Sequence, residues 1–267
     1  MARHALRVAR TEYRAPRAKS RKPISEMSHM KNISNIKRLI FDADDTLWEN
    51  NIHYIKAAED FVDLITPLGY KKETVEQDFQ TMEKNVVKEL GYGSENYILI
   101  LRTLFKRYTI KNANGSLYNK FEEICEKFES HLHLPPRVFP EVPSILSQLR
   151  EKYPLFVLTK GNIEEQKRKL ENSALLTYFQ EAFVETEKDI STYQRLLNEK
   201  GWLAEEVCMI GNSPKSDINP ALRLGMCAVL VPYQHTWVLE DEPLDPNQDR
   251  LKVVNSFSDL PKLFIEG

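Results

Sequence analysis

The feature that most constrains this chain is a short apolar run that ends abruptly in three carboxylates. Residues 39–41 read Leu-Ile-Phe, which is typical of a strand buried on both faces. Asp42, Asp44 and Asp45 follow directly, and open α/β sheets bind ligands at the carboxyl ends of their strands. Because alternate side chains of an extended chain point the same way, Asp42 and Asp44 are predicted to face one site. Two carboxylates so near each other repel unless a cation or a shared proton relieves the repulsion. The alternative interpretation is a polar turn, but a turn does not need three carboxylates.

Composition limits the folds and functions available to such a strand. The chain has 267 residues, of which 42% are hydrophobic, so it can bury the core of one large or two small domains. Its net charge of −2 gives no sign of nucleic-acid binding by the folded core. The three cysteines lack metal-ligand spacing and indicate a reducing compartment, so we expect a cytoplasmic protein. No run reaches the roughly 18 apolar residues of a membrane span, so no membrane partner is expected.

The first 35 residues differ in character from the rest of the chain. Residues 1–38 contain 11 Lys and Arg residues against two Glu, and they show no apolar periodicity. We therefore expect residues 1–35 to form a disordered basic tail. Three other interpretations stay open, namely an organelle transit peptide, an arm that binds nucleic acid, and an upstream extension of a reading frame that begins at Met27 or Met30.

A helical block follows the carboxylate cluster. Between residues 52 and 133 there is no strand-like alternation, and the apolar residues recur at helical spacing. Clusters of Gly and Asn and the pair Pro135-Pro136 supply the breaks between helices. The predicted helices span residues 54–64, 73–90, 96–108 and 117–132.

Strands and helices then alternate. The predicted buried strands are residues 155–158, 182–184, 207–210 and 227–231. Such alternation indicates a three-layer α/β fold, with a doubly wound parallel sheet covered by helices on both faces. We predict a Rossmann-like core of residues 36–50 and 137–267, interrupted after its first strand by an all-helical cap of residues 51–136.

Polar side chains also follow the later strands at their carboxyl ends. Thr159 and Lys160 precede a glycine and a helix, an arrangement that suits a phosphate but also a plain turn. Lys188 lies in a charged loop, where an isolated Lys is usually only solvated surface. Asn212 and Asp217 follow a glycine and are potential oxygen ligands for a hard cation. Each signal is weak alone, but four at successive strand ends indicate one site.

The order and context of these four motifs resemble the haloacid dehalogenase superfamily of phosphatases. Residues 42–47 (Asp-Ala-Asp-Asp-Thr-Leu) are similar to its first motif, Asp-x-Asp-Gly/Asp-Thr-Leu at the end of the first core strand. Thr159 fits the second motif, Lys188 the third, and residues 211–217 the fourth, a glycine followed by acidic metal ligands. The helical block between the first two motifs matches the family's helical cap of the first type, C1. The resemblance spans about residues 36–235.

The resemblance implies a Mg²⁺-dependent phosphomonoester hydrolase that acts on a small soluble phosphorylated metabolite. Asp42 would attack phosphorus to give an aspartyl-phosphate, while Asp44 would protonate the leaving alcohol and then activate water. The residues that would bind phosphate are Thr159, Lys160 and Lys188. The metal ligands would be Asp42, Asp44 through its backbone carbonyl, Asn212 and Asp217.

One departure from the family pattern keeps another function open. Asn212 stands where the family usually has Asp, so the metal site has one negative charge fewer. A phosphate-binding protein with weak or no turnover is therefore an alternative. A 2-haloacid dehalogenase would need no metal and would lack a carboxylate equivalent to Asp44, and a response-regulator receiver domain would lack the helical block. Asp44 and the cap favour phosphoryl transfer over both.

Substrate choice is expected to reside in the cap, because a capped site favours small substrates over phosphoproteins. Trp48 is predicted to seal the cap against the core rather than to stack on a substrate ring. His53 is predicted to be plain surface. Residues 231–237 follow the last predicted strand and can overhang the site.

Overall fold

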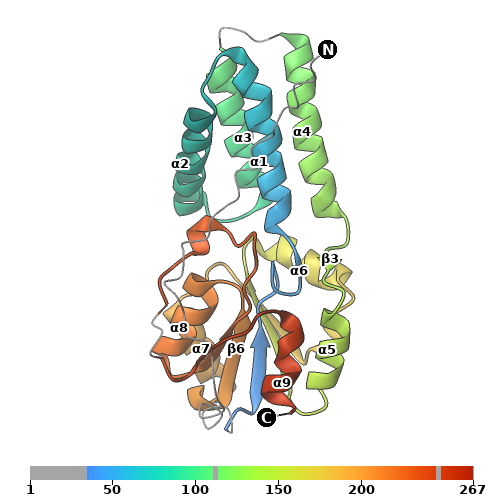
Figure 1. Cartoon of the computed structure of the whole chain (residues 1–267), viewed down its shortest axis with the longest axis vertical. Coiled ribbons are helices and arrows are strands. Elements are labelled where there is room, and N and C mark those ends of the chain that lie inside the picture. Colours follow the sequence, from blue (N-terminus) through green and yellow to red (C-terminus); the bar gives the residue numbers. More distant parts are fainter. Residues whose placement is uncertain (1–34, 111–113, 245–247, 267) are drawn as a thin grey trace, which may run out of the picture.

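The computed structural model describes residues 35–110, 114–244 and 248–266, which form two stacked parts (Figure 1). A parallel sheet with flanking helices, the core, lies below a bundle of four long helices, the cap. The predicted tail of residues 1–35 lies outside the described residues apart from its last residue. Within the described ranges, no helix is both long and apolar enough to cross a membrane.

The sheet of the core contains six parallel strands in the order β5-β4-β1-β6-β7-β8. They are β1 (Arg38–Phe41), β4 (Leu155–Lys160), β5 (Glu181–Glu185), β6 (Val207–Gly211), β7 (Cys227–Leu230) and β8 (Leu251–Val253). The sequence predicts the first five strands but not β8, because β8 has only three residues and the polar Lys252 in its middle interrupts the apolar run. Since β1 pairs with β4 on one side and with β6 on the other, the carboxyl ends of these three strands are neighbours.

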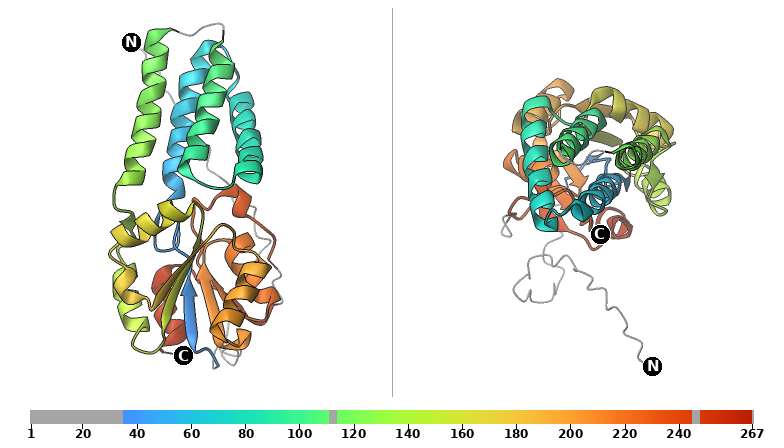
Figure 2. Two further views of the ribbon diagram at one scale, coloured as in Figure 1. Left: turned by 180° about the vertical axis from the view of Figure 1, so that it is seen from behind. Right: turned by 90° about the horizontal axis from the view of Figure 1, so that it is seen from above.

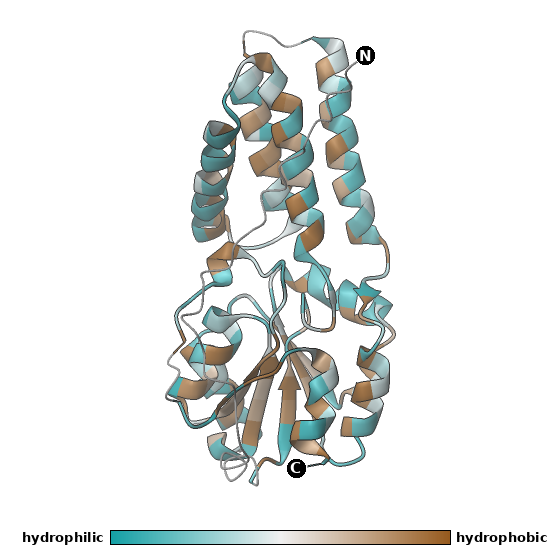
Figure 3. Ribbon diagram, in the orientation of Figure 1, coloured by the Kyte–Doolittle hydropathy of each residue, from teal (hydrophilic) through white to brown (hydrophobic). Residues whose placement is uncertain are grey.

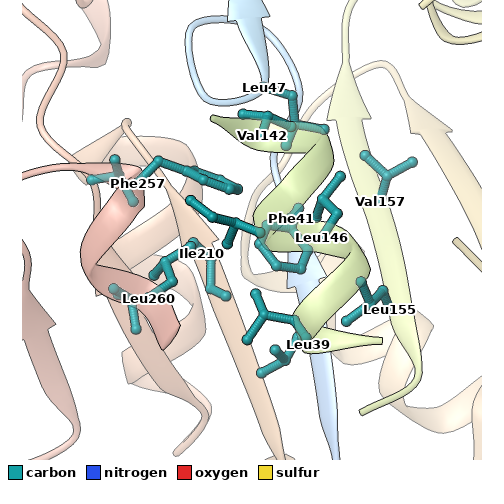
Figure 4. Close-up of a cluster of buried hydrophobic side chains, with 14 of the residues drawn as sticks. Leu39, Phe41, Leu47, Val142, Leu146, Leu155, Val157, Ile210, Phe257 and Leu260 are labelled. Carbon is teal, nitrogen blue, oxygen red and sulfur yellow. The ribbon is translucent and has the colours of Figure 1, made fainter. Parts of the chain in front are cut away.

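Helices cover both faces of this sheet. The core helices are α5 (Val142–Leu149), α6 (Ile163–Asn172), α7 (Ile190–Lys200), α8 (Asn219–Arg223) and α9 (Leu260–Phe264). Leu39 and Phe41 of β1 point to the face covered by α5, α6 and α9, where the Phe41 and Phe257 rings lie 5.9 Å apart (Figure 4). Ile40, between them, packs on the opposite face with side chains of α7 and α8. This alternation of side chains produces the three layers, and the predicted fold class is confirmed.

The cap is a bundle of four helices. They are α1 (Asn51–Ile65), α2 (Lys72–Leu90), α3 (Ser94–Thr109) and α4 (Gly115–His133). All four predicted helices are present, each starting slightly earlier than predicted. Their apolar stripes meet inside the bundle, where Phe61 is fully buried and the Phe105 and Phe121 rings stack 4.0 Å apart. Polar residues cover much of the outside of the helices (Figure 3), as expected for amphipathic helices with one buried stripe.

A short antiparallel ribbon lies where the chain passes between core and cap. It pairs β2 (Trp48–Glu49) with β3 (Arg137–Val138). Both passages of the chain run through this ribbon, beside the predicted boundaries at residues 50 and 137, and the views in Figure 2 show the cap directly above the sheet. Trp48 is fully buried in the core cluster and does not line the cavity described below, so it packs as predicted.

Single-turn helices join the longer elements. They are η2 (Thr66–Leu68), η3 (Leu176–Tyr178), η4 (Ala204–Glu206), η5 (Pro214–Ile218), η6 (Val238–Glu240) and η7 (Phe257–Asp259). Of these, η5 is a π-helical turn that follows β6 closely and carries Asp217. Turns of this rare kind occur frequently at functional sites.

Candidate active site

The candidate site lies at the carboxyl edge of the sheet, where β1, β4 and β6 end side by side. Asp42 follows β1, Thr159 and Lys160 end β4, and Asn212 follows β6. All four line one cavity of about 150 Å³ between the core and the cap, hereafter the cavity. The topology therefore brings together residues that are far apart in the sequence, at the edge where parallel sheets place their sites.

Lys188 is the buried cation of this site. Its ammonium lies 2.6 Å from Asp42 Oδ1 and 2.5 Å from Asp217 Oδ1, and it donates a third hydrogen bond to the Leu158 carbonyl oxygen at 3.2 Å. Burial lowers the pKa of Lys188, but Asp217 and Asp42 outweigh burial and hold this pKa well above its ordinary value. With 3% of its surface exposed, Lys188 is not solvated surface but a full positive charge beside Asp42.

Two carboxylates share that single ammonium, which leaves an excess of negative charge. Burial and the neighbouring Asp42 raise the pKa of Asp217 to about 7, although Lys188 opposes the shift. Each carboxylate oxygen of Asp42 and Asp217 accepts one hydrogen bond and retains a second lone-pair direction. Among the residues that the structure describes, no three His, Cys, Asp or Glu side chains are grouped to hold a metal. With the Asn212 amide oxygen added, the donor set is all oxygen and fits a hard divalent cation.

The fourth motif depends on the glycine at its start. A Cβ on Gly211 would lie 2.2 Å from Asp217 Oδ2, so no larger residue fits between β6 and this carboxylate. The Thr46 hydroxyl donates to Asp42 Oδ2 at 2.7 Å and lies 3.2 Å from Asn212 Oδ1. Thr46 therefore connects the first motif to the fourth and holds the Asp42 carboxylate in place.

Asp44 lines the same cavity, but its carboxylate is held by residues of α6. Lys169 Nζ and Gln166 Nε2 each lie 2.8 Å from Asp44 Oδ2, and the Trp48 indole donates to Oδ1 at 2.6 Å. The sequence reasoning missed Gln166 and Lys169. Their signal is a spacing of three residues on the helix that begins just after the second motif, which places both on one helical face. Asp44 thus has a fixed orientation at the cavity wall.

Asp45 forms the turn that leads into the cap. Its φ of 63° lies in the left-handed region, which Asp tolerates better than most residues with a side chain. Its carboxylate accepts hydrogen bonds from the backbone N–H groups of Asn50 and Asn51, at 2.8 and 3.0 Å, where α1 begins. Burial raises the pKa of Asp45 to about 7 against the effect of these hydrogen bonds. The third Asp of the cluster therefore connects the core to the first helix of the cap.

Lys160 is already neutralised by carboxylates from two other segments. Its ammonium lies 3.0 Å from Glu187 Oε1 and 2.7 Å from Glu240 Oε1. It also lies 4.4 Å from the centre of the Tyr92 ring, which comes from the cap. Lys160 lines the cavity, and its contact with a phosphate stays a prediction.

Thr159 is almost completely buried at the end of β4, beside β1. Its hydroxyl lies 3.4 Å from Gln166 Oε1, on the same amide group that donates to Asp44. Since Thr159 also lines the cavity, a contact between its hydroxyl and a phosphoryl oxygen is compatible with its position and stays a prediction.

The cap supplies the opposite wall of the cavity. Its lining residues are Asn51, Tyr54, Glu83, Val86, Val87, Gly91, Tyr92, Gly93, Asn96, Tyr97 and Ile100. Trp237 and Glu240, from the chain that follows β7, complete this side, as expected for a segment that overhangs the site. His53 is not part of the lining; it is half-buried rather than plain surface, and its ring lies tilted against that of His131, with ring centres 4.6 Å apart.

Hydrogen bonds near the start of α3 hold the cap against the core. The Tyr92 hydroxyl donates to Glu187 Oε2 at 2.8 Å, and the Ser94 N–H donates to Glu165 Oε2 at 3.1 Å. Both cap residues lie at or just before the start of α3, next to the loop that ends α2. The cavity is therefore bounded by cap residues that are bonded to the core.

Comparisons with known proteins identify the family of the chain. The family model of haloacid dehalogenase-like hydrolases matches residues 39–231. N-acylneuraminate-9-phosphatase from Homo sapiens is 24% identical over 240 residues, which cover 86% of this chain and 94% of that protein. Glyceraldehyde 3-phosphate phosphatase from Methanopyrus kandleri is 25% identical over 203 residues, which cover 73% of this chain and 84% of that protein.

A solved structure agrees with these sequence comparisons. A haloacid dehalogenase-like family hydrolase from Xanthomonas campestris superposes with a TM-score of 0.71 and 27% identity, over 87% of this chain and 97% of its own. The family match covers all four motifs, from Asp42 to Asp217. The predicted resemblance is confirmed, and this chain belongs to the haloacid dehalogenase-like hydrolase family.

Proposed function

We propose that this hydrolase is a Mg²⁺-dependent phosphomonoesterase that acts on a small soluble phosphorylated metabolite through an aspartyl-phosphate. The observation that carries the proposal is the position of Asp42, whose buried carboxylate faces the cavity while Lys188 and Thr46 hold it. The curated relatives support it because both are named as phosphatases. The proposed core comprises residues 36–50 and 137–267, and the proposed cap residues 51–136.

In the first half-reaction Asp42 attacks the phosphorus of the ester. A bond forms between the Asp42 carboxylate oxygen and phosphorus, while the bond from phosphorus to the alcohol oxygen breaks. Asp44 gives its proton to that alcohol as it leaves. The product on the protein is an aspartyl-phosphate, so one difficult hydrolysis becomes two easier steps.

In the second half-reaction water attacks the phosphorus of the aspartyl-phosphate. Asp44 takes the proton of the water, the bond between phosphorus and Asp42 breaks, and inorganic phosphate is released with Asp42 restored. General acid and base catalysis of this kind contributes roughly 10²–10⁴-fold to a rate. Gln166 and Lys169 position Asp44 for both proton transfers through the hydrogen bonds that they donate.

Lys188 and Thr159 are the proposed ligands of the phosphoryl oxygens. Lys188 supplies a fixed positive charge next to the attacking carboxylate, in a site where burial strengthens electrostatic interactions. Thr159 supplies a hydroxyl donor from the neighbouring strand. Lys160 has a secondary place in the proposal, because Glu187 and Glu240 already neutralise it.

Four oxygen donors would hold the Mg²⁺ ion of the proposal. They are the side chains of Asp42, Asn212 and Asp217 and the backbone carbonyl of Asp44. When bound, the ion supplies positive charge that offsets the repulsion between Asp42 and the anionic ester. The neutral Asn212 amide gives this set one charge fewer than a third carboxylate would, so we expect weaker binding of Mg²⁺.

We also propose that the protein acts in the cytoplasm on a soluble small molecule, with no membrane partner and no nucleic acid bound by its folded core. Cys125, Cys208 and Cys227 are free and buried, which supports a reducing compartment. The cavity of about 150 Å³ supports a small substrate rather than a phosphoprotein.

A phosphate-release screen over a panel of small phosphomonoesters tests the proposal. We expect release with Mg²⁺, loss of release when the ion is chelated, and loss in the Asp42→Asn variant. Esters that bind without release would indicate the alternative, a phosphate-binding protein with no turnover. Release of halide from 2-haloacids without Mg²⁺ would indicate a dehalogenase, and activity that survives Asp42→Asn would exclude Asp42 as the nucleophile.

A further inference from the structure

The wall of the cavity carries more negative than positive side chains. Three ammonium groups line it, from Lys160, Lys169 and Lys188. The carboxyl groups that line it belong to Asp42, Asp44, Asp45, Glu83, Glu165 and Glu240. Among the described residues neither Arg nor His is part of the lining, so no other basic residue of the described wall compensates the surplus of carboxylates.

Each of the three ammonium groups already has carboxylate partners. Lys188 contacts Asp42 and Asp217. Lys160 contacts Glu187 and Glu240, and Lys169 contacts Asp44, as described above. Beyond the phosphate itself, a second negative group on a substrate would therefore find no unpaired positive charge on the described wall.

Glu83 is the exception among the carboxyl groups of the lining. The others are held by an ammonium or, for Asp45, by two backbone N–H groups. No ion pair joins Glu83 to any basic residue that the structure describes. Burial raises the pKa of Glu83 to about 7, and a side-chain hydrogen bond with Trp237, which favours the charged form, opposes this shift.

Glu83 also lies on the wall that faces the leaving group. It belongs to α2 of the cap, one turn before Val86 and Val87, which line the cavity as well. The catalytic carboxylates Asp42 and Asp44 come from the core, on the opposite side. A phosphate held at Asp42 therefore directs the alcohol part of its ester toward the cap and Glu83.

We propose that the cavity selects phosphomonoesters whose alcohol part is neutral or positively charged and offers a hydroxyl or amino group to Glu83, and that it rejects esters with a second anionic group. This inference rests on the proposed function, because it assumes that a phosphate occupies the site at Asp42. A hydroxyl or ammonium donor on the ester would bind the Glu83 carboxylate, which has no ion-pair partner among the described residues, whereas a carboxylate on the ester would be repelled by it.

Three esters of equal carbon number test the proposal. They are glycerol 3-phosphate, which is neutral beyond its phosphate, 2-amino-3-hydroxypropyl phosphate, which adds an ammonium, and 3-phosphoglycerate, which adds a carboxylate. We would measure kcat/KM for each with Mg²⁺ at pH 8, above the pKa of about 7 of Glu83. We expect the first two esters to exceed 3-phosphoglycerate by at least about tenfold, which corresponds to about 1.4 kcal/mol.

The Glu83→Gln variant should change the ranking of the esters. It keeps the size of the side chain but removes the charge, so the ratio of kcat/KM for 3-phosphoglycerate to that for the amino ester should rise by roughly tenfold or more. Glu89→Gln is the matched control, since Glu89 is exposed on the same helix and does not line the cavity. This control should leave the ratio unchanged.

A binding experiment keeps this inference separate from the proposed function. The affinities of the three esters for the Asp42→Asn variant would be measured by calorimetry with Mg²⁺. Binding in the same charge order without turnover by the wild type would support the inference and overturn the proposed function. Turnover that prefers 3-phosphoglycerate would overturn the inference and leave the function intact. The same conclusion would follow if Glu83→Gln changed the ratio of kcat/KM between 3-phosphoglycerate and the amino ester by less than about twofold. Neither binding nor turnover of any ester would overturn both.

Discussion

The two walls of the cavity differ in how their charges are arranged. On the core side, Asp42, Asp44 and Lys188 lie at or near strand ends, and each charge has an opposite charge within 3 Å. On the cap side, aromatic and aliphatic side chains dominate, and Glu83 lacks a basic partner among the described residues. The core wall is therefore organised in advance for one reaction, whereas the cap wall has a polar group left to be satisfied by a ligand.

The difference suggests how one catalytic arrangement can serve different substrates. Rigid strands and buried ion pairs hold the groups that we propose bind the phosphate, and these would be the same for every ester. Helices and loops present the groups that we propose face the alcohol, and such surface segments change without disturbing the sheet. The comparison predicts that substitutions on the core wall affect all substrates alike, whereas substitutions on the cap wall affect some substrates more than others.

The largest effect should come from Asp42→Asn on the core wall. The amide has nearly the same shape but cannot act as a nucleophile, so kcat should fall by at least about 10³-fold for every ester. Phosphate release under saturating ester measures this loss. A variant that retains more than about a tenth of the activity, or that loses activity with only some esters, would contradict the division between the two walls.

Lys188→Met should lower both stability and activity. Removing one partner from a buried ion pair leaves uncompensated charge and costs about 3–5 kcal/mol, and here two carboxylates lose their shared ammonium. Urea unfolding measures the cost, and Mg²⁺ should recover part of it if Asp42 and Asp217 hold the ion. Lys200→Met is the control, because its ion pair with Glu181 is more exposed and should cost no more than about 1 kcal/mol. Equal losses in both variants would refute the central role of Lys188.

Lys169→Met should slow the reaction without weakening substrate binding. Because Lys169 positions Asp44, we expect kcat to fall by roughly 10²-fold with alkyl phosphates, whose leaving alcohols need a proton. The loss should be smaller with p-nitrophenyl phosphate, whose leaving group departs without one. Lys167→Met on the exposed side of α6 serves as the control. Equal losses with both kinds of ester would show that Lys169 has a structural rather than a positioning role.

Glu83→Gln should change how stability depends on pH. The folded-state pKa of about 7 exceeds the ordinary value of 4.5, so folding takes up a proton in this window. The contribution of Glu83 to the free energy of unfolding of the wild type therefore falls as pH rises from about 4.5 to 7 and then levels off. In the variant this fall should be smaller by about 1–3 kcal/mol, measured by urea unfolding at pH 5 and 8, with Glu89→Gln as the control. A fall identical to that of the wild type would show that Glu83 is ionised at little cost.

The smallest effect should come from Tyr92→Phe, at the contact between cap and core. The variant removes the hydrogen bond that the Tyr92 hydroxyl donates to Glu187 and the one that it accepts from Lys160, but it keeps the ring beside Lys160. One hydrogen bond contributes about 0.5–1.5 kcal/mol, so KM should rise by at least roughly two- to tenfold with little change in kcat. Steady-state kinetics measure both constants, and Tyr118→Phe, on an exposed residue of α4, is the control. A large fall in kcat would assign Tyr92 to the chemistry instead of to closure.

The sequence reasoning located the core wall well, and the reason is local. Asp42, Thr159 and Asn212 each follow or end a recognisable apolar strand, and parallel strands place their carboxyl ends at one edge. The ion pairs that join different segments across the site could not be predicted from the sequence. The pairing of Asp44 with Lys169 joins residues 125 positions apart, and that of Lys160 with Glu240 joins residues 80 apart. Neither follows from any spacing along the chain.

The cap wall shows the same limit more strongly. The sequence predicts that α2 and α3 are helices from their apolar periodicity, but periodicity alone does not show which face of the bundle lies over the sheet. Glu83 is one of several Glu residues on a polar helix, and nothing in its neighbourhood distinguishes it from Glu89. Trp237, its hydrogen-bonding partner, lies beyond the last predicted strand.

The sequence by itself determined the fold class, the inserted helical cap and the family, because these depend on periodicity and on motifs only a few residues long. It also determined which residue types stand at the ends of β1, β4 and β6. Only the tertiary structure decided which charges neutralise one another and which carboxyl group faces the cavity without an ion-pair partner among the described residues. Charge pairing acts over a few ångströms between segments distant in sequence, so it is decided where the chain is brought together.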